Sequence, residues 1–213
     1  MGEVIALETL RSARLARTSA PAATRVEFFF DLACPFAYLA AERVERAFPR
    51  VVWRPTSAAV LRRGDLDRGE LTVLRRAAER RAAELRMPLE WPDRFPADVP
   101  AAMRVAAYAA ECDRGAAFAL AAGRLAFCGG FDLDGPEILA EAAAAAGVDL
   151  PGCLAAARDL ARDGAIENNG RRLLAAGADR LPVLRHGRSL VWGERPIGEV
   201  AGVARARRLA SGT

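Results

Sequence analysis

The 213-residue chain contains no lysine and a single histidine, His186. All 31 of its basic residues are therefore arginines, against 27 acidic residues, and the formal net charge is +4. Arginine pairs such as Arg75-Arg76 and Arg80-Arg81 lie among glutamates, as on a solvated helix face, and few aromatic residues are interleaved with them. We therefore expect no nucleic-acid partner.

Long hydrophobic runs are also missing, and none approaches the roughly 20 residues that cross a bilayer. Residues 1–24 are interrupted by charged side chains, so they do not resemble the apolar core of a secretory signal. They read as a loosely attached N-terminal lead. The sequence thus predicts a cytoplasmic protein with no membrane partner.

Several motifs of catalysis and binding are absent as well. There is no Walker loop, no GxGxxG and no GxSxG elbow. The four cysteines, Cys34, Cys112, Cys128 and Cys153, form no CxxC pair, and with one histidine they predict no metal site. His186 precedes a glycine between two strand-like runs and is expected in an exposed turn. Of the kinds of catalysis considered, only catalysis by a cysteine is left.

Cys34 separates a strand-like run from a helix-like run. Residues 26–30 are β-formers and aromatics, and from Phe36 onward apolar residues recur on one helix face. Pro35 suits a first helical turn. Cys34 is therefore expected beside the N-terminus of a helix, where the dipole favours the nucleophilic thiolate. The alternative is a small hydrophobic residue at a buried junction.

The rest of the chain predicts one sheet assembled from both ends. Residues 51–55 read as a second strand, and residues 71–176 are mostly helical, with breaks rich in Pro, Gly and Asp. The strand pattern returns at Leu181, followed by a hairpin and a last helix over 197–209. Such an order, with strands on both sides of a helical block, indicates an α/β fold.

These features resemble the DsbA-like branch of the thioredoxin superfamily, and more closely the kappa-class glutathione transferase and 2-hydroxychromene-2-carboxylate isomerase group. The resemblance rests on "FFFDLACPFAYLA" at the opening, Arg54-Pro55, Phe95-Pro96, Ala102-Met103-Arg104, Leu181-Pro182 and Trp192-Gly193. It implies a thioredoxin-like fold with a large inserted helical domain. The thioredoxin-like domain would comprise residues 25–60 and 166–210, and the insertion residues 61–165.

The resemblance also implies roles for single residues. Cys34 stands where the isomerase group has a serine that hydrogen-bonds the glutathione sulfur, and where the oxidoreductases have their nucleophilic cysteine. Pro182 matches the family's cis-proline, and Leu181 would offer its backbone to a bound thiol. Position 37 is Ala, so the resolving cysteine of a dithiol motif is missing. Glu194 and Arg195 replace the Ser-Asp or Gln-Asp pair that holds glutathione in the transferases.

The leading prediction is a thiol-dependent isomerase or transferase that acts on a small, aromatic or conjugated electrophile. Its cofactor would be glutathione or another low-molecular-weight thiol, without a metal, and the group commonly forms homodimers. The alternatives are a DsbA-type thiol-disulfide oxidoreductase without a resolving cysteine, and a non-catalytic binding protein. The predicted site consists of Cys34 as the catalytic residue, with Pro35, Phe36, Tyr38, Arg54, Leu181, Pro182, Trp192, Glu194 and Arg195 around the substrate or thiol.

Overall fold

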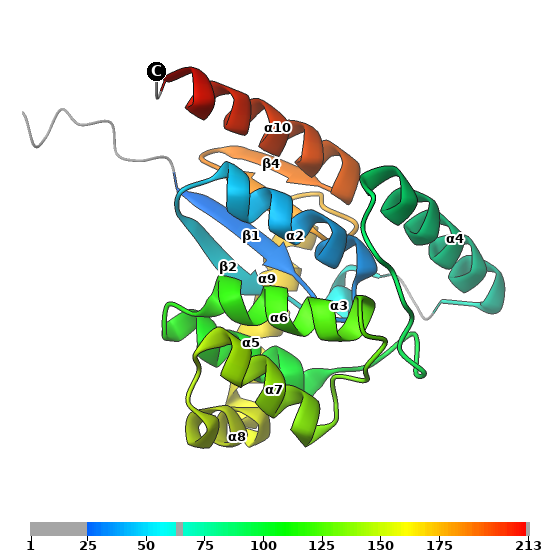
Figure 1. The fold of residues 1–213 in the computed structure, drawn as a ribbon, viewed down its shortest axis with the longest axis vertical. Coiled ribbons are helices and arrows are strands. Elements are labelled where there is room, and N and C mark those ends of the chain that lie inside the picture. Colours follow the sequence, from blue (N-terminus) through cyan, green and yellow to red (C-terminus); the bar gives the residue numbers. More distant parts are fainter. Residues whose placement is uncertain (1–24, 63–65, 212–213) are drawn as a thin grey trace, which may run out of the picture.

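The computed structural model describes residues 25–62 and 66–211 (Figure 1). The predicted lead, residues 1–24, lies outside this part of the chain. Four strands form one sheet in the order β2-β1-β3-β4. They are β1 (Val26–Phe30), β2 (Val51–Pro55), β3 (Val183–His186) and β4 (Ser189–Trp192). β1 runs parallel to β2 and antiparallel to β3, which pairs antiparallel with β4. The prediction of one sheet built from both ends of the chain is confirmed.

Helices account for most of the remaining chain. They are α2 (Pro35–Ala47), α3 (Ala58–Leu61), α4 (Arg68–Leu85), α5 (Pro100–Glu111), α6 (Gly115–Phe127), α7 (Pro136–Ala146), α8 (Leu150–Arg158), the 3-10 segment η1 (Leu160–Arg162), α9 (Asp163–Ala175) and α10 (Glu194–Ser211). The helices α4 to α8 lie in the sequence between β2 and β3, as the predicted insertion does. Within the described residues, no helix combines the length and the hydrophobicity that crossing a bilayer requires.

Alternation along β1 divides the core between the two faces of the sheet. Phe28 and Phe30 belong to the main hydrophobic cluster, which includes residues of α2, α5, α6 and α10. Phe29, between them, belongs to a second cluster with Leu61 of α3 and Leu173 of α9. The sheet is thus covered on both faces, and Figure 1 shows α2 and α9 on opposite sides of β1.

The ends of α7 and α10 show how glycine and proline bound the helices. α7 begins after Gly135 with a proline in its first turn and ends at Gly147, whose φ is +68°. α10 was predicted over residues 197–209 but starts at Glu194. The difference arises because Pro196 lies in the first turn of α10, where its missing N–H breaks no helical hydrogen bond.

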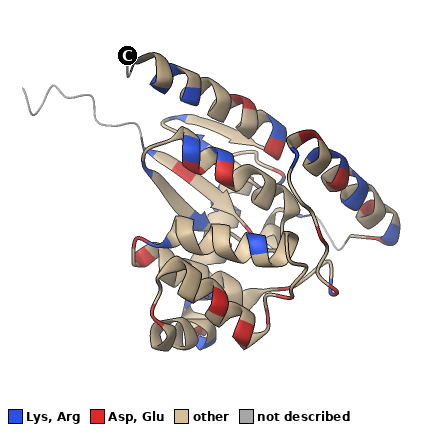
Figure 2. Cartoon of the chain, in the orientation of Figure 1, with Lys and Arg blue, Asp and Glu red and all other residues tan. Residues whose placement is uncertain are grey.

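α4 differs from the other long helices in how it is attached. Only Ala78 and Ala82 of its 18 residues are buried, and Figure 1 shows it at the margin of the molecule, beside the starts of α2 and α10. Figure 2 shows charged residues of both signs along α4 and α10, whereas α6 is largely uncharged. Polar contacts therefore take a large share in holding α4 in place.

Candidate active site at the start of α2

Cys34 is the N-cap residue of α2, as the sequence predicted. Its backbone N–H donates to the carbonyl oxygen of Asp31 at 3.1 Å, and its own carbonyl accepts from the N–H of Ala37 at 3.0 Å. The side chain of Asp31 accepts from the N–H of Ala33 at 2.9 Å and from that of Ala58 at 2.8 Å. Asp31 thus fixes the turn that presents Cys34 and ties it to the start of α3.

The thiol of Cys34 faces the segment before β3. Its Sγ donates to the backbone carbonyl oxygen of Leu181 at 3.8 Å, and the peptide bond between Leu181 and Pro182 is cis. The segments that hold Cys34 and Leu181-Pro182 therefore lie side by side. Sheet pairing produces this arrangement, because Phe29 of β1 lies opposite Val183 of β3.

The ionisation of Cys34 is opposite to the prediction. Burial raises the pKa of the thiol to about 12, and the carboxylate of Asp31 acts in the same direction. The backbone N–H groups of Ala37 and Phe36 and the charge of Arg62 lower this pKa, but they do not offset the loss of solvation. The helix terminus favours the thiolate as expected; desolvation outweighs it. Cys34 is therefore a protonated thiol near neutral pH.

An apolar cavity of about 260 Å³ borders Cys34. Its apolar lining consists of Ala33, Pro35, Phe36, Ala58, Leu61, Leu66, Leu74, Phe95, Pro96, Ala97 and Leu181. The charged residues at the cavity are Arg62, Asp179 and Arg180. A hydrophobic molecule can thus lie against the thiol.

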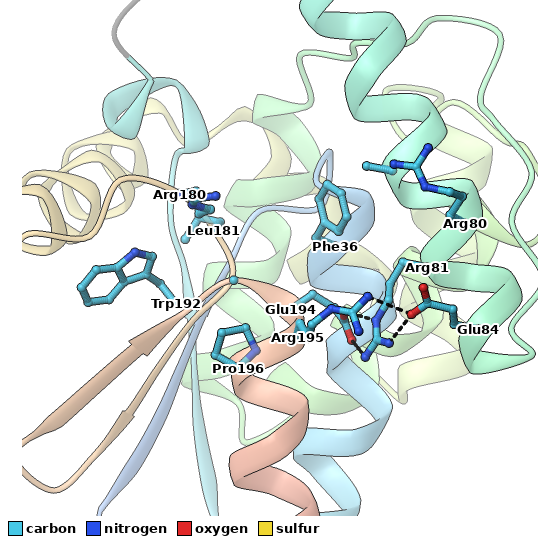
Figure 3. A pocket seen from close by; sticks show the side chains of 12 residues that line it. Phe36, Arg80, Arg81, Glu84, Arg180, Leu181, Trp192, Glu194, Arg195 and Pro196 are labelled. Atoms are coloured by element: carbon cyan, nitrogen blue, oxygen red, sulfur yellow. Dashed lines mark hydrogen bonds and ion pairs between the residues drawn. The ribbon is translucent and has the colours of Figure 1, made fainter.

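A second cavity, of about 500 Å³, shares Phe36, Arg180 and Leu181 with the first. Figure 3 shows its other charged side chains, which come from α4 and from the start of α10. They are Arg80, Arg81, Glu84, Glu194 and Arg195, and Trp192 and Pro196 complete the wall that these side chains begin. Four arginines against two glutamates give this arginine-lined cavity an excess of positive charge, which favours an anionic ligand.

Glu194 is the most buried charged residue of that wall. Its carboxylate is bound by Arg43 of α2 and by Arg81 of α4, with Arg81 Nη2 at 3.2 Å (Figure 3 shows the second pair). Arg81 also pairs with Glu84 at 2.7 Å, and Glu84 pairs with Arg195 at 2.9 Å. The Glu194 carboxylate is thus occupied by protein partners, although the sequence predicted it as a ligand-binding group.

Three predicted site residues line neither of these cavities. Pro182 follows Leu181, and its carbonyl oxygen accepts a hydrogen bond from the backbone N–H of Gly193 at 2.9 Å. Arg54 is held within the sheet, where its Nε and Nη2 donate to Glu27 at 3.1 and 3.0 Å. Tyr38 is buried, donates its hydroxyl to the carbonyl of Pro88 at 3.0 Å, and packs against Phe127. Structural contacts of this kind occupy the side chains of Arg54 and Tyr38.

The other predicted residues do lie at the cavities. Pro35, Phe36 and Leu181 line the apolar one, and Trp192, Glu194 and Arg195 line the arginine-lined one. The sequence missed Arg62, Leu74, Arg80 and Arg81, which lie outside the motifs. Phe95-Pro96 was noticed as a motif, yet its place at the cavity was not foreseen.

The remaining cysteines line neither cavity. Cys153 is buried between α7 and α8, with its Sγ 3.9 Å from the carbonyl oxygen of Leu139. Cys112 and Cys128 are exposed at the C-terminal ends of α5 and α6. All four cysteines are free. Within the described residues, no group of His, Cys, Asp and Glu side chains is arranged to hold a metal ion.

The sequence model of one protein family, the DSBA-like thioredoxin domain, matches residues 25–202 of the chain. The chain belongs to this family. No curated protein sequence matches it. The predicted fold is confirmed by solved structures. The structure of a 2-hydroxychromene-2-carboxylate isomerase has a TM-score of 0.73 and 18% identity, covering 88% of this chain and 98% of that one. A probable DsbA oxidoreductase from Streptomyces coelicolor has a TM-score of 0.64 and 22% identity, covering 88% and 90%. At these identities the similarity establishes the fold of this DSBA-like chain and leaves its reaction open.

Proposed function

We propose that this DSBA-like protein is a thiol-dependent isomerase or transferase acting on a small conjugated electrophile. The observation that carries the proposal is the single protonated thiol of Cys34, which points at the Leu181 carbonyl from the N-terminus of α2. A thiol in this state is a hydrogen-bond donor rather than a nucleophile. Cys34 would donate to the sulfur of a low-molecular-weight thiol cosubstrate, such as glutathione.

The N-terminus of α2 supports the same role. The N–H groups of Phe36 and Ala37 stabilise negative charge at the Cys34 sulfur, and the dipole of α2 would extend this effect to an anionic sulfur bound beside it. A cosubstrate thiol would lose its proton to solvent there and remain as the thiolate.

The chemistry that follows is a reversible addition. The cosubstrate thiolate would form a C–S bond to the β-carbon of a conjugated carbonyl compound, and the π electrons would move to the carbonyl oxygen. The former double bond can then rotate, and re-forming it would expel the thiolate, so that an isomer is released and the thiol is unchanged. Retention of the C–S bond with protonation of the α-carbon would give transfer instead.

The two cavities suit the two reactants. The apolar cavity would hold the electrophile against Cys34, and the arginine-lined cavity would hold the anionic part of the thiol. Glutathione carries two carboxylates, which guanidinium groups bind well. Arg80 is the candidate with least competition, because its side chain makes no hydrogen bond or ion pair within the described part of the chain.

The main alternative is disulfide exchange by Cys34 in the manner of a DsbA-type oxidoreductase. It needs a thiolate to attack and a second thiol to resolve the mixed disulfide. Ala37 occupies the position of a resolving cysteine, and the other three cysteines line neither cavity. A homodimer and a cytoplasmic location stay predictions.

An assay with and without glutathione tests the proposal. Conjugated cis-alkenones would be followed by their ultraviolet absorbance, and insulin reduction in the presence of dithiothreitol would be measured in parallel. Isomerisation or conjugation that requires added thiol supports the proposal. Sustained insulin reduction without isomerisation or conjugation of the alkenones would favour the oxidoreductase. Inactivity in both assays would favour a binding protein.

A further inference from the structure

Arg62 is the one charged side chain at the apolar cavity that forms neither a hydrogen bond nor an ion pair within the described residues. The other two, Asp179 and Arg180, neutralise each other through hydrogen bonds of 2.7 and 3.0 Å. Arg62 is the C-cap residue of α3, and its side chain makes no hydrogen bond or ion pair with the described residues. The cavity therefore presents one positive charge that is exposed and forms no ion pair, beside an otherwise apolar wall.

The charge of Arg62 acts on the thiol of Cys34. It lowers the pKa of Cys34 and also that of Asp31, although burial keeps both values raised. Arg62 also lines a neighbouring cavity, of about 210 Å³, on the side of Asp31. A group bound by Arg62 in the apolar cavity would thus lie close to the sulfur of Cys34.

We propose that the apolar cavity selects a small hydrophobic molecule carrying one anionic group, which Arg62 binds beside Cys34. A guanidinium binds a carboxylate through two parallel hydrogen bonds. The volume of about 260 Å³ is below the roughly 300–1,000 Å³ of pockets for drug-sized ligands. A second charged group on the ligand would find no partner in the apolar wall. This inference rests on the proposed function, since it assigns the substrate class of the same cavity.

The test compares an acid with its neutral amide. Cinnamate and cinnamamide have the same shape and differ in charge, and calorimetric titration of the full chain measures both affinities. We expect cinnamate to bind about tenfold more tightly, and Arg62→Gln to reduce this preference to about twofold or less. Arg76→Gln is the matched control, because Arg76 is exposed on α4 and lines neither cavity.

Three outcomes would overturn the inference: equal binding of the acid and the amide, an acid preference that survives Arg62→Gln, and no binding of either probe at millimolar concentration. Circular dichroism checks that Arg62→Gln is folded. Binding at equilibrium needs no turnover, so Cys34→Ser should keep the acid preference. Arg62-dependent binding without thiol-dependent turnover would refute the proposed function alone, whereas turnover without an acid preference would refute only the role of Arg62.

Discussion

The Sγ of Cys34 lies 3.8 Å from the backbone carbonyl oxygen of Leu181, a residue 147 positions further along the chain. Antiparallel pairing of β1 with β3 brings the two together. Only a protonated sulfur can donate to a carbonyl, so this contact and the raised pKa of Cys34 agree. The contact and the pKa both describe an S–H donor. A bound thiolate could accept its hydrogen bond in place of the carbonyl oxygen of Leu181.

The rate at which Cys34 is alkylated should therefore rise only at high pH. Because the pKa is about 12, well above the ordinary value near 8.5, little thiolate exists at neutral pH. We expect alkylation of Cys34 by iodoacetamide to be slow at pH 7 and still accelerating at about pH 10. Peptide mass spectrometry measures it, with the exposed Cys112 and Cys128 as internal references. A rate that levels off below about pH 8 would contradict the donor role.

The same ionisation affects stability. The thiol of the unfolded chain ionises first as the pH rises, so the stabilising contribution of Cys34 is complete below about pH 8.5. It is then lost progressively as the pH rises toward the folded-state pKa of about 12. Urea denaturation of the wild type between pH 8 and 11 should show a decline that is weaker in Cys34→Ser. Parallel declines would show that Cys34 does not contribute.

Cys34→Ser separates the two enzymatic functions. A serine hydroxyl can still donate a hydrogen bond to a cosubstrate sulfur, but it cannot enter a mixed disulfide. Thiol-dependent isomerisation should survive in part, whereas any disulfide exchange should vanish. Cys34→Ala is the matched variant, since it removes the donor as well, and it should lower the isomerisation rate below that of the serine variant. Equal rates in the two variants would rule out a donor role.

The sequence could predict the location of Cys34 but not its ionisation. The strand, the helix start and the N-cap position follow from local residue patterns, and the resemblance supplied the meeting with Leu181. The balance between the helix dipole and desolvation depends on packing around the thiol, which no local pattern reports. For the same reason Arg62, Arg80 and Arg81 were missed, because only the tertiary fold places α3 and α4 beside Cys34.

Glu194 should be a stability residue rather than a ligand-binding residue. Its carboxylate joins α10 to α2 through Arg43 and to α4 through Arg81. Glu194→Gln removes the carboxylate partner of Arg43 and one of the two carboxylate partners of Arg81 in a largely buried site, and we expect the free energy of unfolding to fall by about 3 kcal/mol in urea denaturation. Glu84→Gln is the control, because Glu84 pairs with Arg81 at the exposed surface and its loss should change little. Equal effects of the two substitutions would argue against the buried role.

Gly164 and Gly170 of α9 form a matched pair, because they differ in the space around them. A Cβ at Gly170 would lie 2.9 Å from the Cβ of Val60 and 3.2 Å from the carbonyl oxygen of Ser57, whereas a Cβ at Gly164 would meet nothing within 4 Å. Gly170→Ala should therefore push α9 away from α3 and lower the free energy of unfolding by about 1–3 kcal/mol. Gly164→Ala should raise it by about 0.5 kcal/mol, since alanine is the better helix former. Because α3 carries Arg62 at its end, Gly170→Ala should also weaken the preference for cinnamate over cinnamamide. An unchanged preference in a destabilised Gly170→Ala variant would show that the position of α3 does not depend on its packing against α9.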